Sequence, residues 1–191
     1  TPGPQQRSVS GTLTLRNRHR TRRVDLRFLR RIVQALLRDT QPNGSFDLGV
    51  CLVLAPEMIR LNETFLRHQG STDVITFNYA EPPKPESLHG EIFVCLDEAV
   101  SQARRFHTTW QSELVRYVVH GMLHLLGYED RNSRARRRMR AAENTQVQRL
   151  SRQFVFRALS PDQTDSRNPR PQRGAGFVRP KRAKTRGTIE E

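Results

Sequence analysis

The sequence predicts an α/β (α+β-like) fold: a single domain in which a small mixed β-sheet of about four strands is covered by about five helices. Apolar residues alternate or run on over strand-length segments, and recur at helical spacing over longer ones. These segments follow each other in the order β-α-β-α-β-β-α-α-α. The length of 191 residues, of which 35% are apolar, suits one domain with polar tails.

Strands and helices alternate in the first half of the domain. Residues 12–17 alternate between apolar and polar and predict a strand. Residues 46–55 are a continuous apolar run, typical of a central strand, and Pro56 suits the first turn of a helix over 56–66. An amphipathic helix is predicted over 25–38 from apolar residues at helical spacing, namely Leu26, Leu29, Ile32, Val33 and Leu36.

The second half begins with two strands and ends with three helices. The strands are predicted at 71–79 and 90–96, with a Pro-rich loop over 81–89 between them. The helices are predicted over 98–106, with Asp97 as its cap, over 110–126 and over 132–156.

Both ends of the chain have the composition of disordered segments. Residues 1–10 are rich in Pro, Gln and Ser, and residues 159–191 are polar and basic. Such segments contain too few large apolar residues to offset the entropy of ordering. The sequence therefore predicts a folded domain over 11–158 between two disordered tails.

The net charge of +14 predicts a polyanionic partner, most simply a nucleic acid. A soluble protein with basic tails and a membrane-surface binder are the alternatives. No apolar run approaches the ~20 residues of a spanning helix, and the N-terminus does not resemble a signal peptide. Cys51 and Cys95 lie in apolar strand-like runs, which indicates buried thiols in a reducing compartment. We therefore expect a cytoplasmic protein without a membrane partner.

The stretch HGMLHLLGYED (120–130) has the spacing of a metal site. Residues four apart lie on one face of a helix, so His120 and His124 project side by side and can bind one ion. Gly127 stands where a helix ends, since glycine accepts the left-handed conformation there. The chain can then turn back, so that Glu129 or Asp130 reaches the same ion.

This helix has two other interpretations. Because the surrounding residues are apolar, both histidines could be core residues bonded to backbone carbonyls; the paired spacing, the glycine and the carboxylate favour a metal. Zinc peptidases with an H-E-x-x-H motif carry a glutamate beside the first histidine as general base, and here that position is Gly121. Peptidase chemistry of that type is therefore not expected.

The sequence resembles the YbeY family of ribosome-associated endoribonucleases over residues 45–150. LNETF (61–65) and STDVITF (71–77) match a Leu-Asn helix end and the strand after it. GEIFVCLDEA (90–99) matches a second strand with its following helix. HGMLHLLGYED is similar to the family pattern His-Gly-x-Leu-His-Leu-x-Gly-Tyr-Asp-His.

The resemblance implies a single α/β domain with one histidine-bound metal ion, usually assigned as zinc. It implies hydrolysis of single-stranded RNA, with a role in maturing the 3′ end of small-subunit rRNA and in ribosome quality control. The implied partners are rRNA, the small ribosomal subunit and its assembly factors, and DNA is not expected. The basic composition agrees independently with an RNA substrate.

The sequence departs from the family pattern at two positions. Asp130 stands where the family has its third histidine ligand, and Glu129 is the alternative third ligand. Two histidines with one carboxylate are a known catalytic zinc set, so the site can be retained. A family arginine after the Leu-Asn helix falls on Leu66, and Arg67 is one residue late. Arg67 is therefore a candidate for pairing with a phosphate oxygen, or else a solvated surface charge.

The segment 131–157 contains nine arginines, a density that suits phosphate backbones. Arg134, Arg137 and Arg138 are the candidate RNA contacts. The alternative is a solvated face on a helix packed through Met139, Ala142, Val147 and Leu150.

Two rival functions remain open from the sequence. One is a catalytically weak or inactive rRNA-binding assembly factor that retains the fold. The other is a metallohydrolase acting on a small molecule or peptide.

Overall fold

The strand-like segments of the sequence join into one mixed sheet in the computed structural model, which describes residues 10–41, 44–67, 69–80, 87–161 and 187–190. The predicted N-terminal tail, apart from Ser10, and residues 162–186 and 191 of the predicted C-terminal tail lie outside this range, as do residues 81–86 of the Pro-rich loop. Disorder in these segments stays a prediction.

The sheet has the strand order β1-β2-β4-β3-β5. β1, β2 and β4 run parallel to one another, and β3 is antiparallel to β4. β5 lies within the predicted C-terminal tail and pairs with β3 in parallel. The predicted mixed sheet is confirmed, and its strands span Ser10–Asn17 (β1), Ser45–Val53 (β2), Val74–Asn78 (β3), Ser87–Cys95 (β4) and Gly187–Glu190 (β5).

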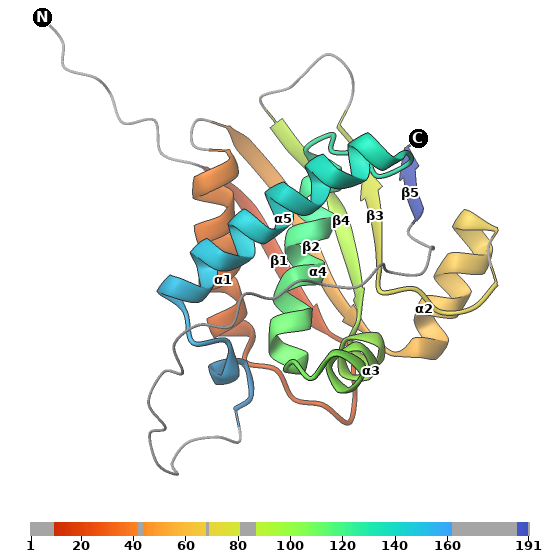
Figure 1. Ribbon diagram of the computed structural model, residues 1–191, viewed down its shortest axis with the longest axis vertical. Coiled ribbons are helices and arrows are strands. Elements are labelled where there is room, and N and C mark those ends of the chain that lie inside the picture. Colours follow the sequence, from red (N-terminus) through yellow and green to blue (C-terminus); the bar gives the residue numbers. More distant parts are fainter. Residues whose placement is uncertain (1–9, 42–43, 68, 81–86, 162–186, 191) are drawn as a thin grey trace, which may run out of the picture.

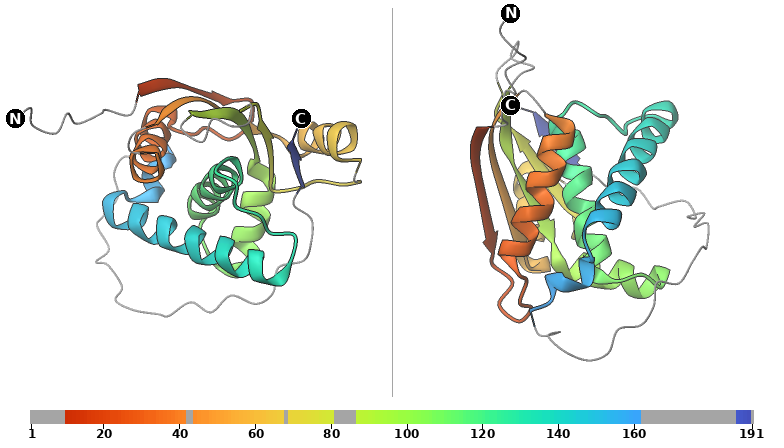
Figure 2. Two further views of the ribbon diagram at one scale, coloured as in Figure 1. Left: turned by 90° about the horizontal axis from the view of Figure 1, so that it is seen from above. Right: turned by 90° about the vertical axis from the view of Figure 1, so that its left-hand side faces the viewer.

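Helices cover one face of this sheet (Figures 1 and 2). α1 and α4 lie directly against the strands, and α5 crosses over them as an outer layer (Figure 2). α3 lies beside the start of α4, and α2 stands out beyond β3 (Figure 1). The α-helices of the described chain span Leu26–Thr40 (α1), Ala55–Leu61 (α2), Leu96–Phe106 (α3), Trp110–Leu125 (α4) and Ser133–Gln153 (α5).

The predicted packing faces are confirmed. Leu29, Ile32, Val33 and Leu36 of α1 are all buried, and the Asp25 side chain caps the helix by accepting from the N–H of Phe28. Met139 and Leu150 are buried on the inner face of α5. Cys51 and Cys95 are buried thiols, and burial raises the pKa of each. None of the described helices is both long and apolar enough to span a membrane.

Three element boundaries differ from the prediction. β4 begins at Ser87, inside the predicted loop, because residues 87–89 continue its parallel pairing with β2. The helix predicted over 56–66 is α2 followed by one π-helical turn, η1 (Asn62–Leu66). The domain continues beyond residue 158, since the 3₁₀ turn η2 (Phe156–Leu159) buries Leu159, whose carbonyl accepts from the N–H of Asp25.

Gly121 lets α4 approach the sheet closely. A Cβ at this position would lie 2.6 Å from Cγ2 of Ile92 and 3.2 Å from Cγ2 of Thr76. Both neighbours are fully buried on β4 and β3, so neither can move aside cheaply. Gly90 of β4 allows the same close approach from the sheet side. A Cβ added at this position would lie 2.8 Å from Cδ2 of Leu125. Gly121, which stands where H-E-x-x-H peptidases have a glutamate, therefore has a packing role.

We expect Gly121→Ala to lower the free energy of unfolding by about 1–3 kcal/mol, because the added methyl overpacks the contact with Ile92. Denaturant unfolding measures this cost. In an Ile92→Ala background the same substitution should cost less, since the clashing methyl is gone. Equal costs in both backgrounds would contradict this account.

His19 and Asp97 tie the β1–α1 loop to α2 and α3. The N–H of Arg22 donates to Nδ1 of His19 (3.0 Å), so the proton of the ring is on Nε2, which donates to Oδ1 of Asp97 (2.9 Å). The N–H of Ala55 donates to Oδ2 (2.8 Å). Asp97 therefore lies inside the first turn of α3 and does not cap it as predicted; Cys95 occupies the cap position.

These contacts give a pH-dependent contribution to stability. Burial raises the pKa of Asp97, but the hydrogen bonds from His19 and Ala55 and the nearby charge of Arg22 outweigh it, and the pKa lies below its usual value. A carboxylate whose pKa is lower in the folded than in the unfolded protein stabilises the fold at pH values above the pKa of the unfolded state. This contribution is lost as the pH falls through the pKa of the folded state. We expect Asp97→Asn to destabilise the protein at neutral pH, and the difference from wild type to shrink below about pH 4. Urea unfolding at several pH values tests this, and a constant difference would refute it.

Candidate metal centre

The carboxyl end of α4 and the turn after it bring the three predicted ligands together. One potential ligand atom from each of His120, His124 and Asp130 lies within 4.8 Å of the others. The helical spacing places the two rings 4.5 Å apart between centroids. Gly127 ends the helix with a φ of 83°, and the N–H of Tyr128 donates to the carbonyl of Leu123. The predicted glycine stop therefore turns the chain back toward the histidines.

Hydrogen bonds fix which nitrogen of each histidine can hold a metal. Nδ1 of His124 lies 3.0 Å from the carbonyl oxygen of Tyr128, which can only accept, so Nδ1 carries the proton. Nδ1 of His120 lies 2.9 Å from Oε2 of Glu143 and donates to that carboxylate. In its neutral form each ring therefore presents a proton-free Nε2, which is the state a metal-binding imidazole needs.

Glu143 connects this site to α5 and was missed by the sequence analysis. It is buried, and its second oxygen accepts from Nη1 of Arg116 at 2.6 Å. Arg116 also donates to Oδ1 of Asn144 (2.9 Å). The available signal was a glutamate in the apolar stripe of α5, four residues after Met139, where a buried carboxylate requires a charged partner.

The residues present fit a zinc ion. Zinc in a tetrahedral site holds nitrogen and oxygen ligands about 3.3 Å apart, so the group needs only a small contraction. His120 is buried and Asp130 is partly exposed, which leaves one side of the group open to solvent. Nη1 of Arg136 holds the Asp130 carbonyl at 3.1 Å and so fixes the backbone of this ligand. Glu129 is exposed and lies outside the group, so Asp130 is the better third ligand.

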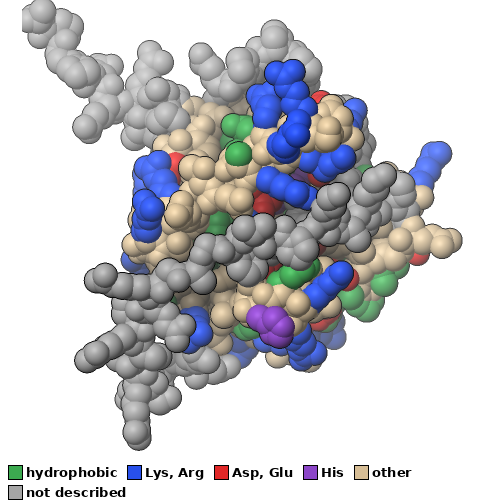
Figure 3. Space-filling view, in the orientation of Figure 1, with side chains coloured by type: hydrophobic (Ala, Val, Ile, Leu, Met, Phe, Trp, Pro, Cys, Tyr) green, Lys and Arg blue, Asp and Glu red, His purple; other side chains and the backbone are tan. Residues whose placement is uncertain are grey.

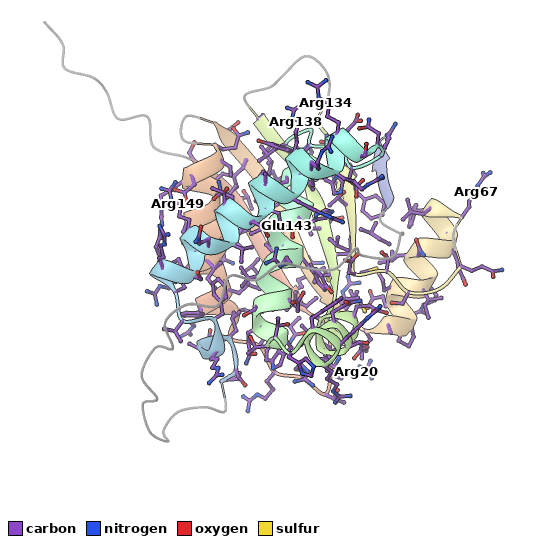
Figure 4. The ribbon with its side chains drawn as sticks, viewed as in Figure 1. Arg20, Arg67, Arg134, Arg138, Glu143 and Arg149 are labelled. Atoms are coloured by element: carbon purple, nitrogen blue, oxygen red, sulfur yellow. The ribbon has the colours of Figure 1, made fainter. Side chains whose placement is uncertain are left out.

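The other predicted site residues are exposed arginines outside the group of His120, His124 and Asp130. Arg67 follows η1 with a φ of 53°, is exposed, and points outward beyond α2 (Figure 4). Arg134, Arg137 and Arg138 are exposed near the start of α5, where the figures show basic side chains gathered (Figures 3 and 4). The structure leaves them accessible to a ligand, and their roles stay predictions.

These features define a single-domain α/β protein with a candidate metal centre of two imidazoles and one carboxylate on one helix and its terminal turn. The chain matches the family model described as "Endoribonuclease YbeY" over residues 14–151. The chain belongs to this family, as the resemblance predicted.

Curated relatives carry the same name. The endoribonuclease YbeY of Salinibacter ruber is 34% identical over 138 residues, which cover 69% of this chain and 87% of that protein. The endoribonuclease YbeY of Chlorobium luteolum is 35% identical over 133 residues, which cover 69% and 93%. The solution structure of TM1509 from Thermotoga maritima is 25% identical, with a TM-score of 0.55 over 83% of this chain and 100% of that one.

We expect Glu143→Gln to weaken zinc binding about 10- to 100-fold, because the neutral amide orients the His120 ring poorly and leaves Arg116 without its ion pair. Competition with a chromogenic chelator measures this affinity. Glu129→Gln is the matched control and should bind zinc like wild type, since that side chain is exposed. Equal affinities of the two variants would show that Glu143 has no influence on the metal.

Proposed function

We propose that this protein is a zinc-dependent endoribonuclease that cleaves single-stranded RNA. We further propose that it acts in the cytoplasm, on the 3′ end of small-subunit rRNA and in ribosome quality control, with the small subunit and its assembly factors as partners. The observation that carries the proposal is the convergence of His120, His124 and Asp130, with both histidine rings oriented by their Nδ1 hydrogen bonds. The names of the relatives support the same activity.

The residues of the chain divide the work of the proposed reaction. When bound, zinc supplies Lewis-acid stabilisation of phosphate charge and lowers the pKa of water. His120 and His124 hold the ion through Nε2, and Asp130 completes the set on the side open to solvent. The carboxylate at residue 130 adds a negative charge at the position where the family pattern has a neutral imidazole. We therefore expect catalysis to need a higher pH than at a three-histidine site.

Arginines supply the affinity for the phosphate backbone in this proposal. Arg134, Arg137 and Arg138 are exposed on α5, whose first turn follows the Asp130 segment directly. Guanidinium groups bind phosphate oxygens with two parallel hydrogen bonds. Arg67 would contact a non-bridging oxygen only after its side chain turns from its outward position toward α4.

Asp130 in place of the family's third histidine is the observation that favours the second candidate, an rRNA-binding assembly factor without catalysis. That protein would keep the fold and the basic surface, and would bind no metal at the histidine pair. Metal content therefore separates the two functions.

We expect purified wild-type protein to contain about one zinc per chain, and Asp130→Ala to lose most of it, because two imidazoles alone bind zinc weakly. Elemental analysis measures this, with Glu129→Ala as the matched carboxylate control that keeps its zinc. Wild-type protein that stays metal-free after zinc loading would favour the assembly factor.

We expect zinc-loaded wild-type protein to cleave a labelled single-stranded RNA, and His124→Ala to lose cleavage while it still binds the strand, since the arginines are unchanged. Cleavage is followed on denaturing gels and binding by fluorescence anisotropy. Residual cleavage at the wild-type rate in His124→Ala would assign the activity to another site or to a contaminant.

A further inference from the structure

A second basic surface lies around α3, beside the start of α4. Two adjoining open hollows of about 460 and 640 Å³ share Arg22, Val100 and Arg104 in their walls. They are bounded by the β1–α1 loop, by α3, by the first turn of α4 and by η2. We call this surface the α3 groove, and define it by the residues Arg22, Asp97, Arg104, Arg105, Trp110 and Arg157.

The α3 groove carries a local excess of positive charge. Four of its six defining residues are arginines, and its one carboxylate, Asp97, already accepts hydrogen bonds from His19 and from the N–H of Ala55. Arg20 lies at the same end of the domain (Figure 4). Gathering like charges costs folding free energy unless a ligand of opposite charge compensates. The groove therefore has the electrostatics of an anion-binding surface.

The fold holds Arg22 in place. The buried His19 pins the β1–α1 loop to Asp97 at the start of α3, so Arg22 meets Arg104 across the groove. The guanidinium of Arg22 stacks over the Trp110 ring at 5.2 Å from its centroid. Its Nε is buried and makes no hydrogen bond to the described residues. An arginine fixed in this way loses little entropy when it binds phosphate.

The shape of the groove favours a strand over a small ion. Arg105 of α3 lines one hollow, Arg157 of η2 lines the other, and Arg104 of α3 lines both, so these exposed arginines are spread along the groove. Positive groups spread along an open groove match the successive phosphates of a nucleic acid backbone. The start of α4, a 16-residue helix, adds partial positive charge at Trp110.

We propose that the α3 groove binds backbone phosphates of single-stranded RNA at a distance from the metal centre. The proposal rests on the function proposed above, since the same RNA strand would reach both places. His124 is fourteen residue steps after Trp110, which corresponds to about 21 Å along α4. Long strands therefore contact both the groove and the metal centre, whereas a tetranucleotide at the metal centre does not reach the groove.

The test compares two double variants of the zinc-loaded full chain. Arg22→Gln with Arg104→Gln removes two groove charges and keeps side-chain volume. Arg38→Gln with Arg60→Gln is the matched control, since both residues are exposed on α1 and α2 outside the groove. The probes are a fluorescent oligouridylate tetranucleotide and a strand several times longer, and anisotropy gives each Kd over a series of salt concentrations.

We expect the groove variant to bind the long strand roughly ten-fold more weakly than the control variant, and the tetranucleotide equally well. The slope of log affinity against log salt should become shallower by about 1.4 for the long strand, because each lost phosphate contact contributes about 0.7. Arg104→Gln alone should give about half of this change in slope. Because residue 104 is exposed, this single variant shows whether the effect of the double variant comes from lost charge or from misfolding.

The possible failures are distinguishable. Equal affinity and equal salt slope in the groove and control variants would overturn the groove, while cleavage of the tetranucleotide by wild-type protein and by both double variants would leave the proposed function intact. Conversely, a long strand that binds through the groove and is never cleaved by zinc-loaded wild-type protein would overturn the endoribonuclease and support the groove.

Discussion

The close contact between α4 and the sheet is the constraint on which the candidate metal centre depends. Without side chains at Gly121 and Gly90, the helix backbone settles between Ile92 and Thr76, and Leu125 packs over β4. This contact sets the rotation of α4, and His120 is adjacent to Gly121 in the chain. A rotation that relieved a larger side chain at residue 121 would turn His120 away from Glu143, because α4 carries the histidine and α5 carries the glutamate.

The centre also depends on α5, which contributes no predicted ligand. Glu143 receives a hydrogen bond from His120 and an ion pair from Arg116, so one buried carboxylate joins the metal face of α4 to the outer helix layer. A buried carboxylate without partners would cost several kcal/mol, and here two donors compensate it. α5 is held in register by Met139 and Leu150 in the core and by an ion pair between Arg149 and Asp39 of α1. Its exposed arginines therefore stand at a defined place relative to the histidines.

Two basic surfaces of the described chain bear on the proposed function. One is the exposed face of α5 around Arg134 and Arg138, and the other is the α3 groove around Arg22 and Arg104. α4 runs from the second toward the first and carries the histidines at its carboxyl end. In the proposed function, a polyanion bound at either surface would owe its affinity to the arginines, and the metal centre, which includes one carboxylate, would supply the reactivity.

The sequence by itself determined most of the elements and the side chains that gather at the end of α4. Periodicity reports burial, so the faces of α1 and α5 were predictable. The i, i+4 spacing with Gly127 predicted His120 and His124 together with Glu129 or Asp130, and the family resemblance favoured Asp130. Tertiary structure alone decided the partners of those residues. Glu143 reaches His120 across 23 residues, His19 reaches Asp97 across 78, and β5 joins β3 from the far end of the chain. Local sequence patterns show that a residue must be buried or must lie in a turn. The packing of distant segments determines which residues contact it.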